Sequence, residues 1–226
     1  MILHGEHIRF RYPNSKQDTL SEFCIALEKG EILAILGESG SGKTTALRII
    51  AGLEQAAGGT LVIDGKTMFS DHTFVEPERR GIGMVFQDYA LFPHMTVKKN
   101  IQYGLKRKSP QEKERIADEM LRLVDLGAHQ DKYPYELSGG QQQRVAIARA
   151  LAYQPSILLL DEPFSNLDTN LVEKIREEIK RILKAAQITS IFVTHNKQDA
   201  LSLADQVIIL QDGRIVQTGP PTACIS

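Results

Sequence analysis

The stretch GESGSGKT, residues 37–44, constrains the fold of this chain more than any other. It matches the phosphate-loop pattern G-x-x-x-x-G-K-[ST] at every fixed position. The apolar run EILAIL precedes it, and TTALRIIAGL follows it with the periodicity of a helix that Gly52 closes. A strand, a glycine-rich loop and a helix in this order form an α/β unit that cradles a phosphate at the helix N-terminus.

Further strands are expected on both sides of that unit. The runs SILLL, TSIFV and QVIIL, which end at residues 160, 193 and 210, alternate with helical patterns and are almost entirely apolar. Such runs are typical of a parallel sheet that is covered on both faces. The stretches EHIRF, FCIAL, TLVI (60–63) and IGMVF (82–86) also predict strands, the first of them in an antiparallel β edge.

The middle of the chain has a helical character. Ser109-Pro110-Gln111-Glu112 is a capping-box pattern. Apolar residues follow it at helical spacing, and Gly127 is the expected stop. GQQQRVAIARALAYQ predicts a second helix. Residues 88–155 are therefore expected to form an inserted helical subdomain in a single domain of 226 residues. Residues 1–87 and 156–226 form its P-loop NTPase (RecA-like) core with the antiparallel β edge.

Composition excludes several classes of function. The 27 Lys and Arg nearly balance 28 Asp and Glu, which gives no overall attraction to nucleic acid or anionic membranes. The two cysteines, Cys24 and Cys224, predict unpaired thiols in a reducing compartment. The longest apolar runs are too short to span a bilayer, and the N-terminus lacks the apolar stretch of a signal peptide, so any membrane role is expected to be peripheral.

The phosphate loop predicts a nucleoside triphosphate site. Backbone N–H groups of residues 37–42 can close around phosphate oxygens. Lys43 is expected to reach the β- and γ-phosphates, and the Thr44 hydroxyl to ligate Mg²⁺. The whole loop consists of Gly37, Glu38, Ser39, Gly40, Ser41, Gly42, Lys43 and Thr44.

Acidic residues follow the buried strand ILLL within ILLLDEP, residues 157–163. Asp161 is expected to hold Mg²⁺ directly or through water, because ligands of open α/β sheets bind at the carboxyl ends of strands. Glu162 is positioned to orient and deprotonate an attacking water. Gln87, after IGMVF, could contact the metal or that water, and Tyr12 could stack on a purine ring.

The stretch FVTHNKQD, residues 192–199, permits two interpretations. Asn196 to Asp199 spell N-K-x-D, as in the guanine-binding motif of P-loop GTPases. A GTPase also needs a D-x-x-G switch, and no Asp in this chain has Gly three residues later. The favoured interpretation uses His195, whose imidazole at a strand end can hydrogen-bond a γ-phosphate.

A second phosphate cradle is predicted at LSGGQQQR, residues 137–144, where Ser138 and two glycines open a helix. In sequence order, the set GESGSGKT, Gln87, LSGGQQQR, ILLLDEP, SNLD and His195 resembles the ATP-binding cassette (ABC) ATPases over essentially the whole chain.

That resemblance implies how the two cradles cooperate. In ABC ATPases two cassettes pack head to tail, and each ATP lies between the P-loop of one and the LSGGQ of the other. It implies ATP and Mg²⁺ as ligands, with Tyr12 on adenine and Thr45 near the phosphates. It also implies that Gln87 links the catalytic site to a transmembrane partner. The residues expected to face the partner cassette are Ser138, Gly139, Gly140, Gln141 and Asp168.

The stretch DYALFPHMTVKKNI after Gln87 resembles bacterial importer cassettes, particularly those for ferric iron, polyamines, molybdate or thiamine. Tyr89, Leu91, Phe92, Pro93 and Met95 form an expected socket for a membrane subunit. The resemblance implies a homodimer on transmembrane permease subunits, at the cytoplasmic face of the plasma membrane, supplied by a solute-binding protein. Ferric iron is the first expected cargo and polyamine the second.

A soluble ABC ATPase that acts on DNA or ribosomes is the second hypothesis. Such proteins usually carry a long coiled coil or a second cassette, and neither pattern occurs here, nor does a basic stripe. Many importer cassettes of this type continue into a β-rich regulatory domain, whereas this chain ends at QTGPPTACIS.

Overall fold

A six-stranded sheet forms the centre of the computed structural model, which describes residues 1–165, 167 and 172–225. Its strand order is β11-β10-β3-β9-β8-β7. The five strands from β10 to β7 are parallel, and β11 pairs antiparallel with β10. Their bounds are β3 Ile32–Leu36, β7 Ile82–Val85, β8 Ile157–Asp161, β9 Thr189–Thr194, β10 Gln206–Gln211 and β11 Arg214–Gly219. The predicted parallel sheet is confirmed.

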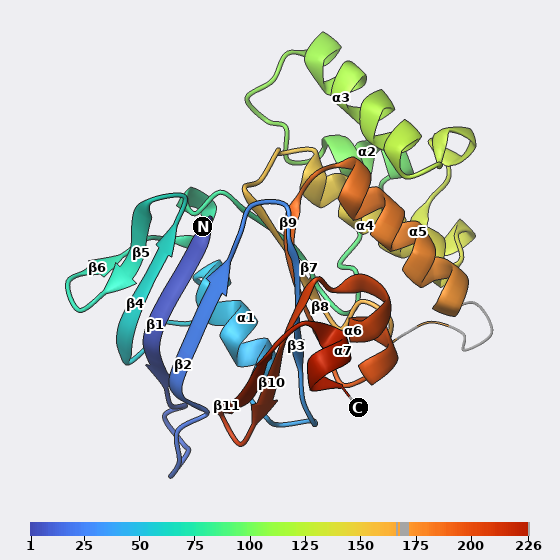
Figure 1. Cartoon of the computed structure of the whole chain (residues 1–226). Helices are drawn as coiled ribbons and strands as arrows, with labels where there is room; N and C mark the ends of the chain where they lie inside the picture. Colours follow the sequence, from blue (N-terminus) through green and yellow to red (C-terminus); the bar gives the residue numbers. More distant parts are fainter. Residues whose placement is uncertain (166, 168–171, 226) are drawn as a thin grey trace.

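Both faces of this sheet are covered. Every residue of β3, β8 and β9 is buried, as their apolar runs predict. Helix α1 (Lys43–Ala51) covers one face. Helices α5 (Val172–Ala185), α6 (Lys197–Leu203) and α7 (Pro221–Cys224) lie on the other side (Figure 1). Residues of alternating parity along β3 and β8 therefore belong to two separate hydrophobic cores.

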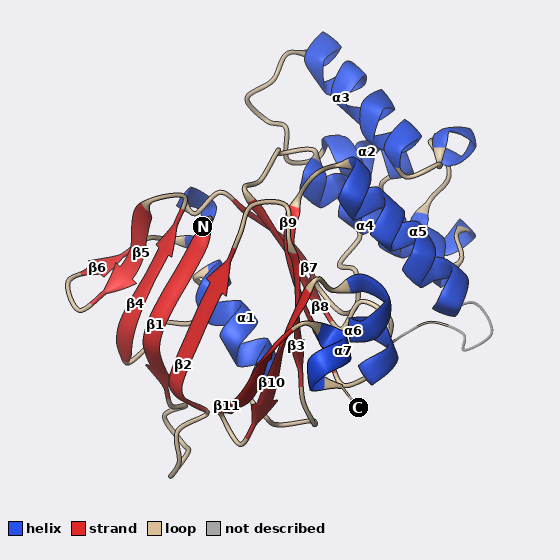
Figure 2. Ribbon diagram, viewed as in Figure 1, coloured by secondary structure: helices blue, strands red, loops and turns tan. Residues whose placement is uncertain are grey.

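A second, antiparallel sheet packs over α1, so the helix lies between two sheets (Figure 2). Its order is β2-β1-β4-β5-β6. The strands are β1 Leu3–Phe10, β2 Leu20–Leu27, β4 Gly58–Ile63, β5 Lys66–Ser70 and β6 Thr73–Phe74, and a 3₁₀ turn, η1, covers Pro77–Arg79. The antiparallel β edge is confirmed; β5, β6 and β11 have no counterpart in the sequence-based expectations.

Three helices gather at one end of the molecule, namely α2 (Val97–Gln102), α3 (Pro110–Leu123) and α4 (Gly139–Leu151) (Figure 1). The capping box at Ser109 and Glu112 is present. Helix α3 ends before Gly127, because Asp125 already takes a positive φ of 53°. The 3₁₀ turns η2 (Gly127–His129) and η3 (Pro134–Glu136) then lead to α4. The subdomain boundaries at residues 88 and 155 stay a prediction.

Helix α5 packs on the sheet through an apolar stripe, in which Ile175, Ile179 and Leu183 are buried. Both Cys24 and Cys224 are unpaired. No helix within the described ranges has the length and apolar character needed to cross a lipid bilayer.

Candidate functional site

The loop between β3 and α1 has the backbone of an anion cradle. Gly42, the N-cap of α1, has a φ of 102°, and no side chain caps the helix. The N–H groups of the first helical turn lack partners within the helix, so they can bind an anion. A Cβ on Gly37 would lie 2.3 Å from the carbonyl oxygen of Leu210, and only glycine fits there. The hydroxyl of Ser41 is buried in this loop and has no hydrogen-bond partner among the described residues.

Lys43 lies inside the same loop and is 4% exposed. Its Nζ donates to the carbonyl oxygens of Gly37 (2.9 Å) and Glu38 (2.7 Å), so the side chain folds back along the loop. Burial lowers the pKa of Lys43, and the nearby carboxylates of Glu162 and Asp161 partly oppose this effect. A phosphate in the loop would supply the counter-charge that the buried ammonium needs.

Thr44 and Asp161 meet at the carboxyl end of the parallel sheet. The Thr44 hydroxyl donates to Asp161 Oδ1 at 3.0 Å. Burial raises the pKa of Asp161, and the charge of Glu162 adds to the rise, while the Thr44 hydrogen bond opposes it. A buried carboxylate next to a second carboxylate favours binding of a cation.

These oxygens suit Mg²⁺, which takes hard oxygen ligands and is usually held by one or two carboxylates together with phosphates and waters. Across the described residues, no group of three or more His, Cys, Asp and Glu side chains could hold a metal by itself. Thr44 and Asp161 therefore fit a cation that arrives with a phosphate-bearing ligand.

Glu162 and His195 lie next to each other at the carboxyl ends of the neighbouring strands β8 and β9. Glu162 follows β8 with a positive φ of 42°, an uncommon conformation for a residue with a Cβ. Its Oε2 lies 3.5 Å from Nδ1 of His195, the residue after β9. Both residues line one cleft of about 750 Å³ together with Gly37, Glu38 and Ser39. The structure thus brings the predicted general base, the predicted sensor and the phosphate loop together.

Gln87 reaches the same region through a serine that the sequence reasoning did not single out. Gln87 Nε2 donates to Ser165 Oγ at 3.2 Å, and that hydroxyl donates to the Glu162 carbonyl oxygen at 3.0 Å. Strand β7 ends at Val85, so Gln87 lies in the loop after it. A hydroxyl three residues beyond the acidic pair is the only sequence signal that could have indicated Ser165.

Tyr12 lies beside the start of α1. Its hydroxyl is 3.3 Å from Thr45 Oγ1, and its ring meets Phe10 edge-on with centroids 4.7 Å apart. The ring is half-buried. The Tyr12 side chain therefore lies beside the first turn of α1, and its stacking on a purine ring stays a prediction.

The second cradle opens α4 but is built differently from the first. Ser138 caps the helix by accepting from the Gln141 N–H, and Gln141 Oε1 accepts from the Ser138 N–H. An added Cβ on Gly140 would lie 2.7 Å from Cδ1 of Ile175. Gly140 therefore lets α4 pack closely against the Ile175 side chain of α5, and a larger residue would require that side chain to move.

Nothing in the described part of the chain joins this cradle to the phosphate loop by a hydrogen bond or ion pair. Ser138 is exposed at the molecular surface. Asp168 lies outside the described residues.

The N-K-x-D stretch has a structural explanation. Asn196 caps α6, because its side-chain oxygen accepts from the Gln198 N–H at 2.8 Å. Asp199 is 3% exposed and accepts from Thr194 and Arg176, so its carboxylate is already engaged inside the protein. Neither residue is placed as a reader of a guanine base.

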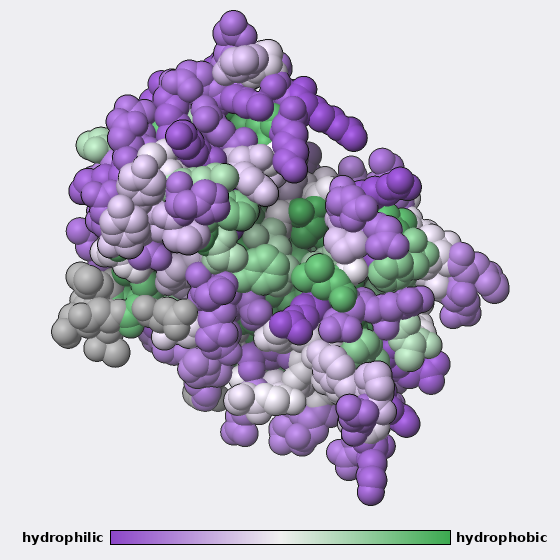
Figure 3. Space-filling model, turned by 180° about the vertical axis from the view of Figure 1, so that it is seen from behind, coloured by the Kyte–Doolittle hydropathy of each residue, from purple (hydrophilic) through white to green (hydrophobic). Residues whose placement is uncertain are grey.

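An apolar groove of about 630 Å³ runs along the β7 edge of the sheet, on the face seen in Figure 3. Phe86, Tyr103 and Tyr153 are its exposed large apolar residues. Of the five residues in the expected socket only Phe92 lines this groove. Tyr89 is buried instead, and Leu91 packs against the core.

Arg149 of α4 holds the segment beside this groove. It donates to the carbonyl oxygens of Tyr89 (2.9 Å) and Ala90 (2.6 Å), which take positive φ values of 61° and 45°. The Arg149 guanidinium therefore ties the backbone at Tyr89 and Ala90, beside the groove, to helix α4.

Comparison with known sequences gives a consistent result. A profile described as ABC transporter matches residues 20–165. The sulfate/thiosulfate import ATP-binding protein CysA of Caulobacter vibrioides is 50% identical over 217 residues, which cover 93% of this chain and 61% of the relative. The Fe(3+) ions import ATP-binding protein FbpC of Yersinia pestis is 52% identical over 203 residues, 89% of this chain and 58% of the relative. The chain thus spans about three fifths of the length of these curated relatives.

Solved structures of the same fold agree. The structure of cbiO1 from Clostridium perfringens, described as part of the ABC transporter complex cbiONQ, has a TM-score of 0.89 at 30% identity, with 99% of this chain and 90% of that chain covered. The ATP-binding cassette MJ0796, solved as a dimer in a post-hydrolysis state bound to ADP and Pi, has a TM-score of 0.80 at 31% identity, with 97% and 99% covered. The predicted fold class is confirmed.

Proposed function

The chain belongs to the ABC transporter family, and on that premise we propose that it is the ATP-hydrolysing subunit of a bacterial ABC importer. The observation that carries the proposal is the convergence of Lys43, Glu162 and His195 on one phosphate loop. The import ATP-binding proteins that this chain resembles support the direction of transport.

The residues of the site divide the work of phosphoryl transfer to water. Backbone N–H groups at the start of α1 and the Lys43 ammonium bind the β- and γ-phosphates. Thr44 and Asp161 would hold Mg²⁺, with Gln87 as a further candidate ligand, and the ion would supply positive charge to the phosphate oxygens. Tyr12 stacks on the adenine.

The Glu162 carboxylate accepts a proton from the attacking water, and His195, whose Nδ1 lies 3.5 Å from Glu162 Oε2, donates a hydrogen bond to the γ-phosphate. The positive φ of Glu162 supports this role, since a strained backbone is retained where it points a side chain into a site.

The exposed cradle at the start of α4 completes the site in a second copy of the chain. Ser138, Gly139 and Gln141 supply hydrogen bonds and a helix N-terminus to the partner's γ-phosphate, while lacking a lysine or metal ligand of their own. ATP binds the closed pair more tightly than the open one, and hydrolysis reverses the preference. The dimer of MJ0796 is a precedent within the same fold. Asp168 is proposed as a contact across the same interface.

The apolar groove along β7 is proposed as the docking site for transmembrane permease subunits, because an exposed apolar patch marks an interaction surface. Gln87, the neighbour of Phe86 in the groove, is linked to the catalytic loop by its hydrogen bond to Ser165. Residues 88–155 are proposed to move with it as a helical subdomain. The protein would then lie peripherally on the cytoplasmic face of the plasma membrane, with solute delivered to the permease by a separate solute-binding protein.

The proposed cargo is an inorganic ion. Ferric iron remains the first candidate, supported by the FbpC relatives, and sulfate or thiosulfate is the second, supported by the CysA relatives. Sulfate was not among the cargoes expected from the sequence. Identifying the solute-binding protein that co-purifies with the assembled transporter separates the two.

Steady-state ATP hydrolysis by the purified chain tests the activity. Glu162→Gln should lower kcat by about 10²- to 10⁴-fold, the range of a lost general base, while leaving ATP binding intact. Glu177→Gln, on the exposed side of α5, is the matched control and should retain the parental rate. Equal rates in the parent and Glu162→Gln would refute the assignment. Stimulation by DNA or RNA would favour the non-transport hypothesis.

A further inference from the structure

One buried ion pair lies behind the catalytic cleft, and its contacts bear on His195. The inference rests on the proposed function, because it concerns how that residue is positioned. The His195 side chain is 60% exposed, so packing around its own ring does not hold it. Its position relative to Glu162 must come from the residues on either side of it.

Thr194, immediately before His195, is 3% exposed. Its hydroxyl accepts from the Asn196 N–H at 3.0 Å and donates to Asp199 Oδ2 at 2.6 Å. One hydroxyl therefore bridges the residues on both sides of His195. The Thr194 carbonyl oxygen also accepts from the Gly37 N–H at 3.4 Å, which joins this turn to the phosphate loop.

Asp199 forms an ion pair with Arg176 of α5, which links the turn at His195 to that helix. Its Oδ1 accepts from Arg176 Nε at 2.8 Å and lies 2.6 Å from Nη2, so the guanidinium grips the carboxylate with two nitrogens. Both side chains are at least nine-tenths buried. A buried pair of this kind repays its desolvation only with good geometry, and it contributes directional order more than net stability.

Arg176 also contacts the loop that carries Glu162. Its guanidinium carbon lies 5.9 Å from the ring centroid of Phe164, two residues after Glu162. A small pocket of about 240 Å³ is lined from both sides, by Glu162 and Phe164 and by Thr194, His195 and Asp199. Arg176 thus stands at the junction of the two loops that present the reacting side chains.

We propose that Arg176 and Asp199 form a positioning pair that, through the Thr194 hydroxyl, sets His195 at its distance from Glu162. Neither member touches the nucleotide. The pair raises turnover by holding His195 in the geometry that contacts the γ-phosphate, and it does not contribute to ATP affinity. Misplacing a reacting group by about 1 Å can cost as much as 10²-fold in rate, so such a device has a measurable effect.

The test is a double-mutant cycle on the purified chain, read as single-turnover ATP hydrolysis. Asp199→Asn keeps the shape of the side chain and removes its charge. It should lower the rate about tenfold and change the ATP affinity by less than about twofold. In a His195→Ala background the same substitution should change the slow residual rate by less than about twofold, because its target is gone.

Thr194→Val is the second variant. It deletes the hydroxyl link and leaves the Arg176–Asp199 pair in place, and it should reproduce both results. Where Asp199→Asn does not fold, as judged by thermal denaturation, Thr194→Val decides the outcome.

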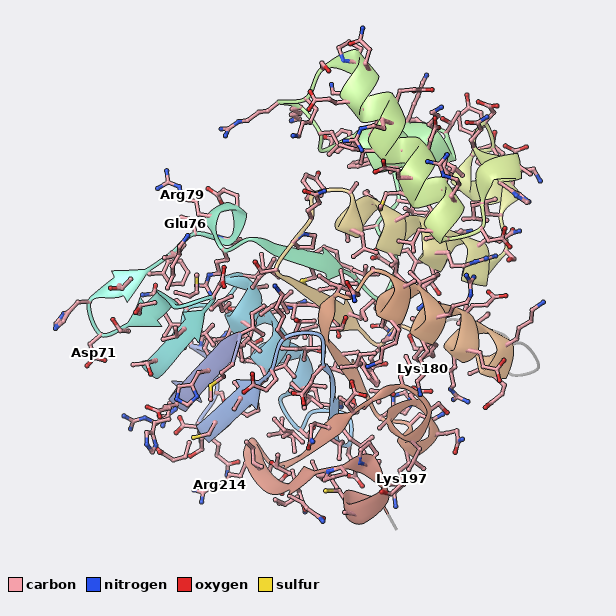
Figure 4. All side chains as sticks on the ribbon, turned by 45° about the horizontal axis from the view of Figure 1, so that its top comes forward. Asp71, Glu76, Arg79, Lys180, Lys197 and Arg214 are labelled. Carbon is pink, nitrogen blue, oxygen red and sulfur yellow. The ribbon has the colours of Figure 1, made fainter. Side chains whose placement is uncertain are left out.

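Lys180→Met is the matched control, because Lys180 joins the same two helices by donating to the Ser202 carbonyl oxygen at 2.6 Å, at an exposed position (Figure 4). It should retain the parental rate. The inference is overturned when the control loses as much activity as Asp199→Asn, or when Asp199→Asn and Thr194→Val act equally with and without His195. A parent chain without ATPase activity refutes the proposed function itself, whereas an active parent indifferent to these variants refutes only the positioning pair.

Discussion

Two neighbouring arginines offer a sharp test of how α1, the helix of the phosphate loop, is anchored. Arg80 is 2% exposed, whereas Arg79 is exposed and projects from the molecule (Figure 4). Arg80 Nη1 donates to the carbonyl oxygens of Ile49 (2.8 Å) and Ile50 (3.0 Å), at the C-terminal end of α1, and Nε donates to Val75. A single side chain therefore caps the end of the helix.

The magnitude of its contribution follows from the contacts. Burial lowers the pKa of Arg80 from 12.5 to about 10, against the opposing charge of Glu76. At 1.36 kcal/mol for each pKa unit, that difference corresponds to a cost of about 3 kcal/mol for the buried guanidinium. Three hydrogen bonds from a charged donor return about 1.5–3 kcal/mol each. The net contribution is about 1–6 kcal/mol, with about 3 kcal/mol as the central expectation.

Arg80→Met should therefore lower the free energy of unfolding by about 3 kcal/mol, measured by urea denaturation, because the carbonyl oxygens of Ile49, Ile50 and Val75 each lose the hydrogen bond from the guanidinium. Arg79→Met should stay within about 0.5 kcal/mol of the parent, as surface substitutions do. Equal stabilities of the two variants would refute the reasoning. An equal fall in the free energy of unfolding in both variants is included in that outcome.

Further predictions concern Asp161, Gly140 and Arg149. Burial raises the pKa of Asp161 in the folded chain above its unfolded value of 3.8. Between these two pKa values the folded state binds more protons than the unfolded state, so stability falls as the pH rises. Above the raised pKa the ionised Asp161 carboxylate carries its full cost in stability. Asp161→Asn should thus raise the unfolding temperature at pH 7 without nucleotide, and the gain should vanish as the pH falls toward 3.8; a gain that persists at low pH contradicts the assignment. Gly140→Ala should cost about 1–2 kcal/mol in urea denaturation, and Ile175→Val should relieve part of that cost; strict additivity would rule out the contact. Arg149→Met should raise the rate of amide hydrogen exchange at Tyr89 and its neighbours, because it removes two hydrogen bonds to residues with positive φ. Unchanged exchange rates would show that Arg149 does not stabilise this segment.

Much of the fold follows from local sequence. The runs that became β3, β8 and β9 are apolar throughout because both faces of the sheet are covered, and such runs are visible without a structure. Strands β5 and β11 are mixed in polarity and lie near sheet edges, with most of β11 exposed, so their sequences KTMFS and RIVQTG carry no strong periodic signal. Helix α3 ends at Leu123, and the left-handed turn after it is made by Asp125 rather than by glycine, so the helix stops earlier than the expected Gly127.

Some residues of the candidate site can be predicted from local sequence, and others cannot. Lys43, Thr44, Asp161 and Glu162 belong to short motifs, so their types and spacing predict where they lie. Arg176 does not, because its partner Asp199 is 23 residues away and is joined to it only by the fold. Residues whose role depends on distant partners cannot be found from spacing alone.

The central claim is that the cradle at the start of α4 binds the nucleotide of a second chain. The most direct measurement is the molar mass of Glu162→Gln in solution, by light scattering, with and without Mg-ATP. The account predicts a change from 25.2 kDa to about twice that value, as expected for a closed two-fold dimer. Adding Gly139→Glu, which keeps the helix but places a negative charge at the cradle, should abolish the doubling and leave ATP binding intact. A mass that stays at 25.2 kDa with ATP bound, or a doubling that Gly139→Glu does not affect, would contradict the claim.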